Sequence, residues 1–195
     1  MRDFGSIKRV IIKIGTNTLS RDGAVDTSYM EEIARQVAEI RGLGKEAVIV
    51  TSGAIGMGAG SLGYDKAVKK VEMRQACAAI GQPLLMHEYH TAFKSYGIVI
   101  AQVLITAEVL RHRKTYVNLK NAIETLLHLG VIPVINENDC VSTAEIGTAF
   151  GDNDRLSALV ASKLDADLLV MLSDVDALYD KDPRKHTDAS PLSEV

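Results

Sequence analysis

The chain has 195 residues, of which 47% are hydrophobic, and its 22 basic and 25 acidic residues give a formal net charge of −3. This length and composition suit one ordinary globular domain, and the near balance of charge argues against a nucleic-acid binder that relies on a basic face. No apolar run reaches the ~18 residues of a membrane span, and the N-terminus lacks the apolar core of a secretory signal. Cys77 and Cys140 form no CxxC pair, so we expect no disulfide framework and a reducing, cytoplasmic setting.

Apolar, β-prone runs recur along the chain, with helical patterns between them. The five runs are Lys8–Ile14, Ala47–Thr51, Ile98–Ile105, Val131–Ile135 and Leu168–Leu172. Each run is continuously apolar rather than alternating, which is typical of strands covered on both faces. The alternation of strands with helices predicts an α/β fold in which a mostly parallel sheet is sandwiched between helices.

Helical periodicity fills the segments between these strands. An apolar stripe on the first long helix consists of Met30, Ile33, Val37 and Ile40. Asp26, Thr27 and Ser28 offer N-caps for this helix, and Ser28 and Glu31 have the spacing of a capping box. A long Ala-rich segment around Val71–Tyr96 predicts a helix that Pro83 breaks or restarts. Two further helices are expected at Thr115–Leu129 and Asp154–Leu164.

Polar residues follow the strands at their carboxyl ends, where open α/β sheets bind ligands. These residues are Lys13, Gly15 and Thr16 on the first strand, Ser52, Gly53 and Ala54 on the second, Asn136–Asp139 on the fourth, and Ser173 and Asp174 on the fifth. One cation, hydroxyls, amides, carboxylates and glycines would thus meet at one edge of the sheet. This convergence is a stronger indication of a ligand site than any single motif.

Lys13 stands inside an otherwise apolar strand, where a buried ammonium is unfavourable unless it is paired or used. Taken alone, it could equally extend its amine to solvent from the wet end of the strand. Gly15, Thr16 and Asn17 follow directly, and glycine N–H groups and short polar side chains bind phosphate oxygens. Together these residues favour a charge aimed at an anion.

The segment Thr51–Gly60 is the richest in glycine. A glycine turn that enters a helix exposes N–H donors to a ligand, whereas close backbone packing is the alternative role. Gly58–Gly63 fits G-x-G-x-x-G, but its first glycine comes seven residues after Thr51, and no strand with an acidic end follows about 20 residues later. A dinucleotide site is therefore excluded, and the chain contains no P-loop motif.

Two acid-amide clusters, Asn136–Asp139 and Gly151–Asp154, flank a small polar segment, Cys140–Phe150, that could cover a substrate. Helix capping explains only one of the last three residues of the second cluster. Their carboxylates suit Mg²⁺ bound together with phosphate oxygens, so we expect Mg²⁺ with a nucleotide and no separate metal site. Cys140 has no histidine near it in sequence and is expected to be a packed thiol.

The motifs match those of a known family. The strongest matches are Lys13–Thr16, Val50–Ile55, Val134–Asp139, Gly151–Ala158 and Asp174–Tyr179. Along essentially its whole length the chain resembles the glutamate 5-kinases of the amino-acid kinase family. Several of these motifs are shared across the wider family, and the Asn-Glu-Asn-Asp and Gly-Asp-Asn-Asp pair points to the glutamate branch.

The resemblance implies that Lys13 contacts the ATP phosphates and the transferred phosphoryl group, and that Asp154 organises the active-site lysines. It implies that glutamate is bound by Ser52, Asp139 and Asn153, with Gly53, Ala54 and Asn136 near them. It also implies nucleotide contacts by Ser173 and Asp174. From the residue chemistry we add Asp152 to the glutamate set, and Gly15 and Thr16 to the ATP set.

The implied reaction is ATP-dependent phosphorylation of the side-chain carboxylate of L-glutamate to glutamyl 5-phosphate, the first step of proline biosynthesis, with ATP and Mg²⁺ as cofactors. The carboxylate is already ionised at pH 7, so no general base is needed and catalysis reduces to positioning and charge stabilisation. The resemblance further implies a cytoplasmic homo-oligomer, proline as a candidate feedback inhibitor, and no nucleic-acid or membrane partner.

The sequence departs from the family in two respects. Ala177 replaces a usual glycine, which matters only if that turn needs a positive φ. Family kinase domains also continue into a Gly-Gly-Met-x-Thr-Lys segment with a second lysine, and many add a PUA domain. We therefore expect residues 1–195 to hold the substrate-binding part and the start of the nucleotide-binding part, with weak or no activity alone.

Two other functions stay open at this point. One is a kinase of the same family that acts on N-acetylglutamate, aspartate, carbamate or UMP. The other is a non-catalytic module that binds an amino acid or another anion. The Asn-Glu-Asn-Asp cluster favours glutamate over the first alternative, and the retained Lys13, Asp154 and Asp174 argue against the second.

Overall fold

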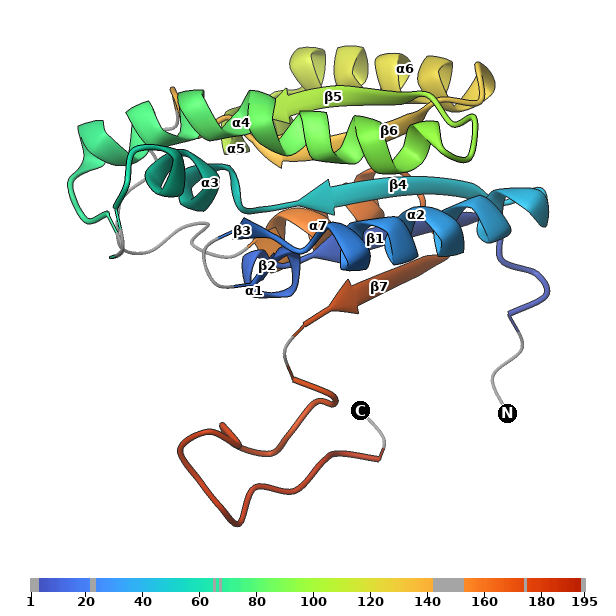
Figure 1. Cartoon of the computed structure of the whole chain (residues 1–195). Coiled ribbons are helices and arrows are strands. Elements are labelled where there is room, and N and C mark those ends of the chain that lie inside the picture. Colours follow the sequence, from blue (N-terminus) through green and yellow to red (C-terminus); the bar gives the residue numbers. More distant parts are fainter. Residues whose placement is uncertain are drawn as a thin grey trace.

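The structure, a computed structural model, describes residues 4–21, 24–64, 66, 68–141, 153–173 and 175–193. Its centre is a five-stranded sheet in the order β5-β6-β4-β1-β7, in which every pairing is parallel (Figure 1). The strands are β1 (Arg9–Ile14), β4 (Glu46–Thr51), β5 (Ile100–Ile105), β6 (Ile132–Glu137) and β7 (Leu168–Leu172). The predicted α/β fold and parallel sheet are thus confirmed.

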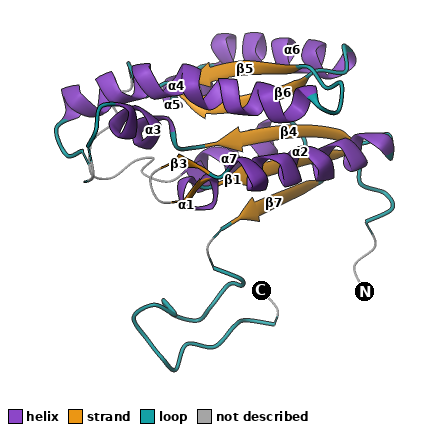
Figure 2. Cartoon of the chain, viewed as in Figure 1, coloured by secondary structure: helices purple, strands orange, loops and turns teal. Residues whose placement is uncertain are grey.

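The helices lie on both faces of this sheet (Figure 2). They are α1 (Thr16–Leu19), α2 (Thr27–Gly42), α3 (Ala54–Ser61), α4 (Val71–Lys94), α5 (Ala107–Arg111), α6 (Arg113–His128) and α7 (Asn153–Lys163). A short hairpin joins β2 (Ser20–Arg21) to β3 (Ala24–Val25). After β7 the chain extends away from the sheet through residues 175–193 (Figure 1). Within the described residues, no helix is long and apolar enough to cross a membrane.

Two apolar cores fill the space between the sheet and the helices. Alternate residues of β1 face opposite layers: Val10, Ile12 and Ile14 pack with α2 and α4, and Ile11 packs with α6 and α7. The same alternation turns Lys13 toward the layer of α7. The position of this ammonium therefore follows from strand geometry and is independent of any ligand.

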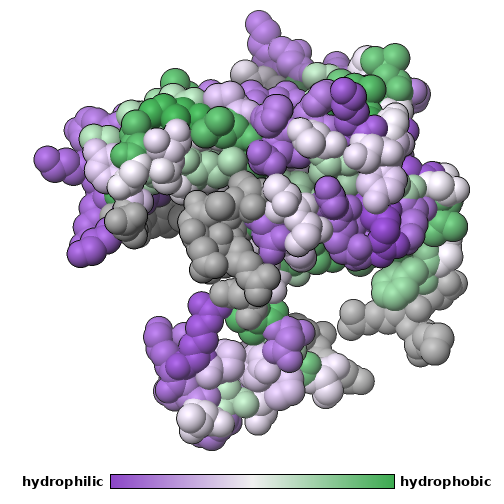
Figure 3. Space-filling model, in the orientation of Figure 1, coloured by the Kyte–Doolittle hydropathy of each residue, from purple (hydrophilic) through white to green (hydrophobic). Residues whose placement is uncertain are grey.

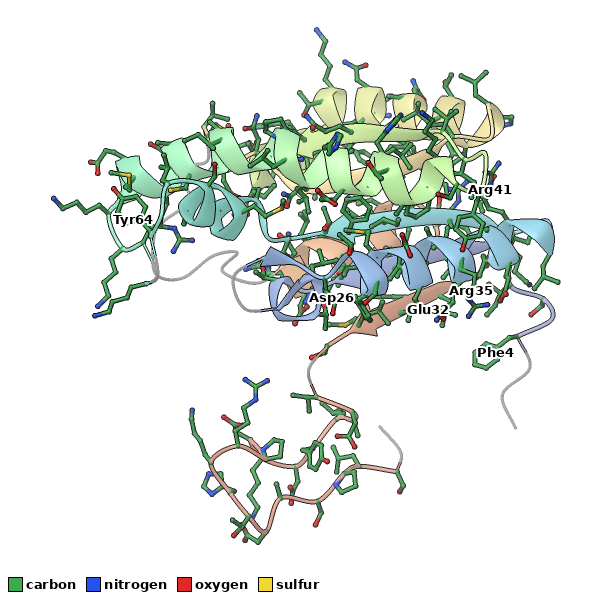
Figure 4. All side chains as sticks on the ribbon, viewed as in Figure 1. Phe4, Asp26, Glu32, Arg35, Arg41 and Tyr64 are labelled. Atoms are coloured by element: carbon green, nitrogen blue, oxygen red, sulfur yellow. The ribbon has the colours of Figure 1, made fainter. Side chains whose placement is uncertain are left out.

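The N-terminus of α2 is capped by Asp26, whose Oδ1 accepts a hydrogen bond of 3.0 Å from the backbone N–H of Tyr29. Ser28 donates its hydroxyl to the same oxygen, at 2.6 Å, so the expected Ser28–Glu31 capping box is wrong. Asp26 takes the role because it immediately precedes the first helical residue. Glu32, which pairs with a neighbouring arginine at 2.5 Å, lies on the exposed face of the same helix (Figure 4).

Pro83 does not break α4, which runs continuously from Val71 to Lys94. The expected interruption is therefore wrong. A proline inside a helix removes one N–H donor, here the partner of the Ala79 carbonyl. Both Pro83 and Ala79 are exposed, so water can satisfy that carbonyl and the helix continues.

Glycines let α3 and α4 cross at very short range. A Cβ added at Gly58 would lie 1.9 Å from the carbonyl oxygen of Cys77, and one added at Gly81 would lie 1.8 Å from that of Ala54. The helical part of the glycine-rich segment therefore serves packing. Gly53, at φ +105°, forms the left-handed turn between β4 and α3.

Candidate functional site

Lys13 and Asp154 form an ion pair at the carboxyl edge of the sheet. Lys13 is 5% exposed, and its Nζ contacts Oδ1 of Asp154, a half-buried residue in the first turn of α7. A carboxylate at this position is also favoured by the dipole of the helix. The buried and paired ammonium excludes the alternative in which Lys13 extends into solvent.

Gly15 and Thr16, at the end of β1, contact the ends of the strands on both sides of it. The N–H of Gly15 donates to the carbonyl of Leu172 on β7 at 3.4 Å. The methyl group of Thr16 lies 3.9 Å from the position of a Cβ on Gly53, which follows β4. Thr16 begins the short helix α1, so this segment is a helical turn.

Asn153, at the start of α7, connects the ends of β4 and β6. Its Nδ2 donates to the carbonyl of Thr51, to Oγ of Ser52 at 2.9 Å and to Oδ1 of Asn136 at 3.0 Å. Asn153 and Asn136 are buried, at 8% and 2% exposure. Ser52, Asn136 and Asn153, which come from distant parts of the sequence, thus form one polar cluster, called the amide cluster below.

Two residues of α4, neither of them predicted from the sequence, contact Asn136 and Thr51 at this edge. Gln82 accepts a hydrogen bond of 2.8 Å from Nδ2 of Asn136, and the Tyr89 hydroxyl lies 2.8 Å from Oγ1 of Thr51. Burial raises the pKa of Tyr89 well above its usual value, so the phenol stays neutral. No sequence motif marks Gln82 or Tyr89. The signal that could have identified them is a polar side chain on the buried face of α4.

Asp139 lies just after β6 and is half-buried. Burial, reinforced by the negative charge of Glu137, raises the pKa of its carboxyl to about 6, although Arg74 acts in the opposite direction. Within the described residues Asp139 makes no hydrogen bond to Lys13 or to the amide cluster. It therefore shares the carboxyl edge with them as a separate, readily protonated acid.

Comparison with known proteins identifies the family to which this arrangement belongs. The family model "Amino acid kinase family" matches residues 8–195. The chain belongs to the amino acid kinase family. It is 50% identical over 200 residues to a glutamate 5-kinase of Methanosarcina mazei, a match that covers 98% of this chain and 52% of the relative.

A second relative and a solved structure agree with this assignment. A glutamate 5-kinase of Thermus thermophilus is 50% identical over 195 residues, covering 100% of this chain and 52% of the relative. The chain thus spans about half the length of these relatives. An isopentenyl phosphate kinase structure matches with a TM-score of 0.63 at 18% identity, over 94% of this chain and 80% of that one, which shows the shared fold.

In this member of the amino acid kinase family, the strand order separates the two sets of expected ligand contacts. β4 and β6 lie on one side of β1 and carry Ser52, Gly53, Ala54 and the amide side chain of Asn136. β7 lies on the other side of β1, and Ser173 follows its last residue; the exposed Ser173 accepts a hydrogen bond at Oγ from the N–H of Val175 at 3.3 Å. Lys13 on β1 is therefore placed between the two sets.

Some expectations for this family member concern residues outside the described part. Asp152, Asp174 and most of the expected flap Cys140–Phe150 lie there. Cys140 itself is exposed, so the expectation of a packed thiol is wrong. Among the described non-glycine residues, Asp165 alone has a positive φ, so the turn at Ala177 does not require glycine.

Proposed function

We propose that the chain contributes the acceptor site of a kinase that transfers the γ-phosphoryl group of ATP to the side-chain carboxylate of L-glutamate, giving glutamyl 5-phosphate and ADP. The observation that carries the proposal is the buried Lys13–Asp154 pair between the amide cluster and the end of β7. The names of the two relatives at 50% identity support glutamate as the acceptor.

The chemistry requires two anions to approach each other. An oxygen of the glutamate carboxylate, ionised at neutral pH, forms a bond to the γ-phosphorus while the bond to the leaving oxygen of ADP breaks. The Lys13 ammonium, fixed by Asp154, would stabilise the negative charge that gathers on the transferred group. Ser52, Asn136, Asp139 and Asn153, beside Gly53 and Ala54, would hold the amino acid.

The ATP phosphates fit the β1 side of the site. A Cβ on Gly15 would lie 3.4 Å from Nζ of Lys13, so a side chain at this position would crowd the ammonium. Within the described residues, no group of three His, Cys, Asp or Glu side chains could hold a metal ion. Mg²⁺ would be held by phosphate oxygens together with one or two carboxylates of the acid-amide clusters, and it would neutralise phosphate charge.

Several broader features belong to the same proposal. The 195 residues would comprise the substrate-binding part and the start of the nucleotide-binding part of the kinase domain. The reaction would be the first step of proline biosynthesis in the cytoplasm, with proline as a candidate inhibitor. These 195 residues alone would show weak or no activity, because one preorganised charge donor, such as the second lysine of the family's Gly-Gly-Met-x-Thr-Lys segment, typically contributes ~10²–10³-fold to a rate.

An assay that traps glutamyl phosphate as its hydroxamate, with ADP release measured in parallel, tests this function. Turnover is expected with L-glutamate, more slowly than in the longer Thermus thermophilus relative, and Lys13→Met should lower it by roughly 10²–10³-fold. Lys45→Met is the matched control. It also removes a lysine, but one whose Nζ donates to the carbonyl of Ile7 at 2.6 Å, just before the start of β1 and away from its carboxyl end. Unchanged turnover in Lys13→Met would contradict the proposed role.

A ligand panel separates the alternative functions. Glutamate, N-acetylglutamate, aspartate, carbamate, UMP and proline would each be added with and without Mg-ATP, and the thermal stability of the chain measured. The proposal predicts stabilisation by glutamate and by Mg-ATP. Stabilisation by proline alone, with no effect of Mg-ATP, would favour a non-catalytic amino-acid-binding module.

We also propose that the chain forms a homo-oligomer through α4. Apolar side chains gather on the outer surface of the α3–α4 corner (Figure 3). The large apolar side chains exposed on these two helices or at their ends are those of Leu62, which follows α3, and Ile80 and Leu84 of α4, at 49%, 36% and 40% exposure. Ile80 and Leu84 are one helical turn apart, so they lie on one face of α4 and suit a contact between copies.

A further inference from the structure

Side-chain amides form a continuous hydrogen-bonded line from α7 to β5. Nδ2 of Asn153 donates to Oδ1 of Asn136 at 3.0 Å, and Nδ2 of Asn136 donates to Oε1 of Gln82 at 2.8 Å. Nε2 of Gln82 then donates to Oε1 of Gln102 at 3.4 Å. Each amide thus donates to the next one, in a single direction.

Two backbone groups fix this direction. The carbonyl of Thr51 only accepts hydrogen bonds, so the group of Asn153 that faces it must be the NH₂. The N–H of Glu137 only donates, at 2.9 Å, so the group of Asn136 that faces it must be Oδ1. The NH₂ of Asn136 is consequently turned to α4, where it needs an acceptor, and Oε1 of Gln82 is that acceptor.

The line also determines what Asn153 can offer to a ligand. The two hydrogens of its NH₂ are shared among three acceptors, on Thr51, Ser52 and Asn136. In the described part of the chain, no group donates to Oδ1 of Asn153. The orientation of this oxygen at the edge of the site therefore depends on these three acceptors together, and Gln82 helps to hold one of them, Asn136.

We propose that Gln82 is a positioning residue for glutamate binding, acting through Asn136 and Asn153. Gln82 lies on α4, 7% exposed, and none of its hydrogen bonds reaches Lys13 or Asp154. Without its acceptor, the buried NH₂ of Asn136 would lack a partner, and the Asn136 side chain would rotate to find one. The proposal rests on the proposed function, because it takes L-glutamate as the ligand of the amide cluster.

Three variants of α4 test the proposal by titration calorimetry with L-glutamate. Gln82→Met keeps the side-chain length but removes the acceptor, and should weaken binding by about tenfold, the effect of losing one well-made hydrogen bond. Gln82→Glu keeps an acceptor for Asn136 and should restore affinity to within about threefold. Gln75→Met, on the same helix and without a side-chain hydrogen bond to any described residue, is the control and should bind like the parent chain.

The side-chain NH₂ resonances of Asn136 and Asn153 give a second readout that needs no ligand. Both pairs should shift in Gln82→Met and keep their positions in Gln75→Met. Wild-type affinity in Gln82→Met, or unshifted NH₂ resonances, would overturn the positioning role. If the parent chain binds no L-glutamate, the proposed function fails, and the NH₂ shifts alone then decide whether Gln82 orients these amides.

Discussion

The ammonium of Lys13 and the NH₂ group of Asn153 are held by groups that belong to the protein. Lys13 pairs with Asp154, and Asn153 is held by Thr51, Ser52 and Asn136. A buried polar group without a partner destabilises a fold, so these contacts let the site exist before any ligand binds. Preorganised charge of this kind is what phosphoryl transfer between two anions requires.

Asp139 should make the stability of the chain depend on pH. Its folded-state pKa of about 6 lies above the ordinary 3.8, so ionisation opposes folding as the pH rises through this interval. Asp139→Asn should therefore match the parent below pH 4 and exceed it at pH 7.5 by about 1 kcal/mol, a value reduced for solvent screening. Urea unfolding at both pH values measures this, with Glu108→Gln, an exposed acid, as the control.

The same group should make glutamate binding depend on pH. The ionised carboxylate of Asp139 attracts the ammonium group of an amino acid, whereas the protonated form does not. Affinity for L-glutamate should thus fall as the pH drops through about 6 in the parent chain. Calorimetric titration at pH 5 and pH 7.5 checks this, and an equal pH dependence in Asp139→Asn would argue against a role for Asp139.

The residues of the candidate site could be predicted from sequence where a polar side chain interrupts or ends an apolar run. Lys13 and Asn136 stand out in this way. Gln82 and Tyr89 do not, because they lie in a helix of mixed composition and acquire partners only through the crossing of α4 under β4 and β6. Their roles depend on contacts between segments far apart in sequence, which no local pattern records.

At the level of elements, the α3–α4 crossing should be intolerant of any side chain at its glycines. Gly81→Ala would place a Cβ 1.8 Å from the carbonyl of Ala54, so one helix must move, and unfolding free energy should fall by roughly 2–3 kcal/mol. Gly42→Ala is the matched control at the end of α2, where a Cβ meets nothing within 4 Å. It should be neutral or stabilising by up to about 1 kcal/mol. Equal stability of the two variants would contradict the close crossing.

The long elements were predictable because their signals are local. The expected strand Leu168–Leu172 matches β7, and the helix expected at Asp154–Leu164 differs from α7 by one residue at each end. The expected break at Pro83 failed because solvent exposure, a tertiary property, decides whether a lost helical hydrogen bond is tolerated. The short helix α1 was missed because four residues are too few to show a helical period.

At the scale of the whole molecule, the exposed face of α4 predicts an oligomer. Light scattering on the intact chain should give a mass larger than that of one chain, and Leu84→Glu should lower it, because a charge in an apolar contact is poorly solvated. Leu43→Glu is the control, since Leu43 is 73% exposed at the end of α2. A parent chain with the mass of a single copy, or an unaffected mass in Leu84→Glu, would exclude this contact.

The sheet itself predicts where the two substrates lie. β1 is buried between β4 and β7, so the glutamate set on β4 and β6 and the ATP set on β1 and β7 flank Lys13 from opposite sides. Under the proposed function, the carboxyl edge of the sheet would thus separate the two anions and place one ammonium between them. The polar strand ends predicted that these residues meet at one edge of the sheet. They did not predict the strand order, which puts the two sets on opposite sides of β1.

A crystal structure of the chain with L-glutamate and a non-hydrolysable Mg-ATP analogue tests this arrangement most directly. We expect the amino-acid end of glutamate at Asn153, Ser52 and Asp139, its side-chain carboxylate toward Nζ of Lys13, and the nucleotide phosphates beside Gly15. Glutamate bound away from the amide cluster, or both ligands on the same side of β1, would contradict the account.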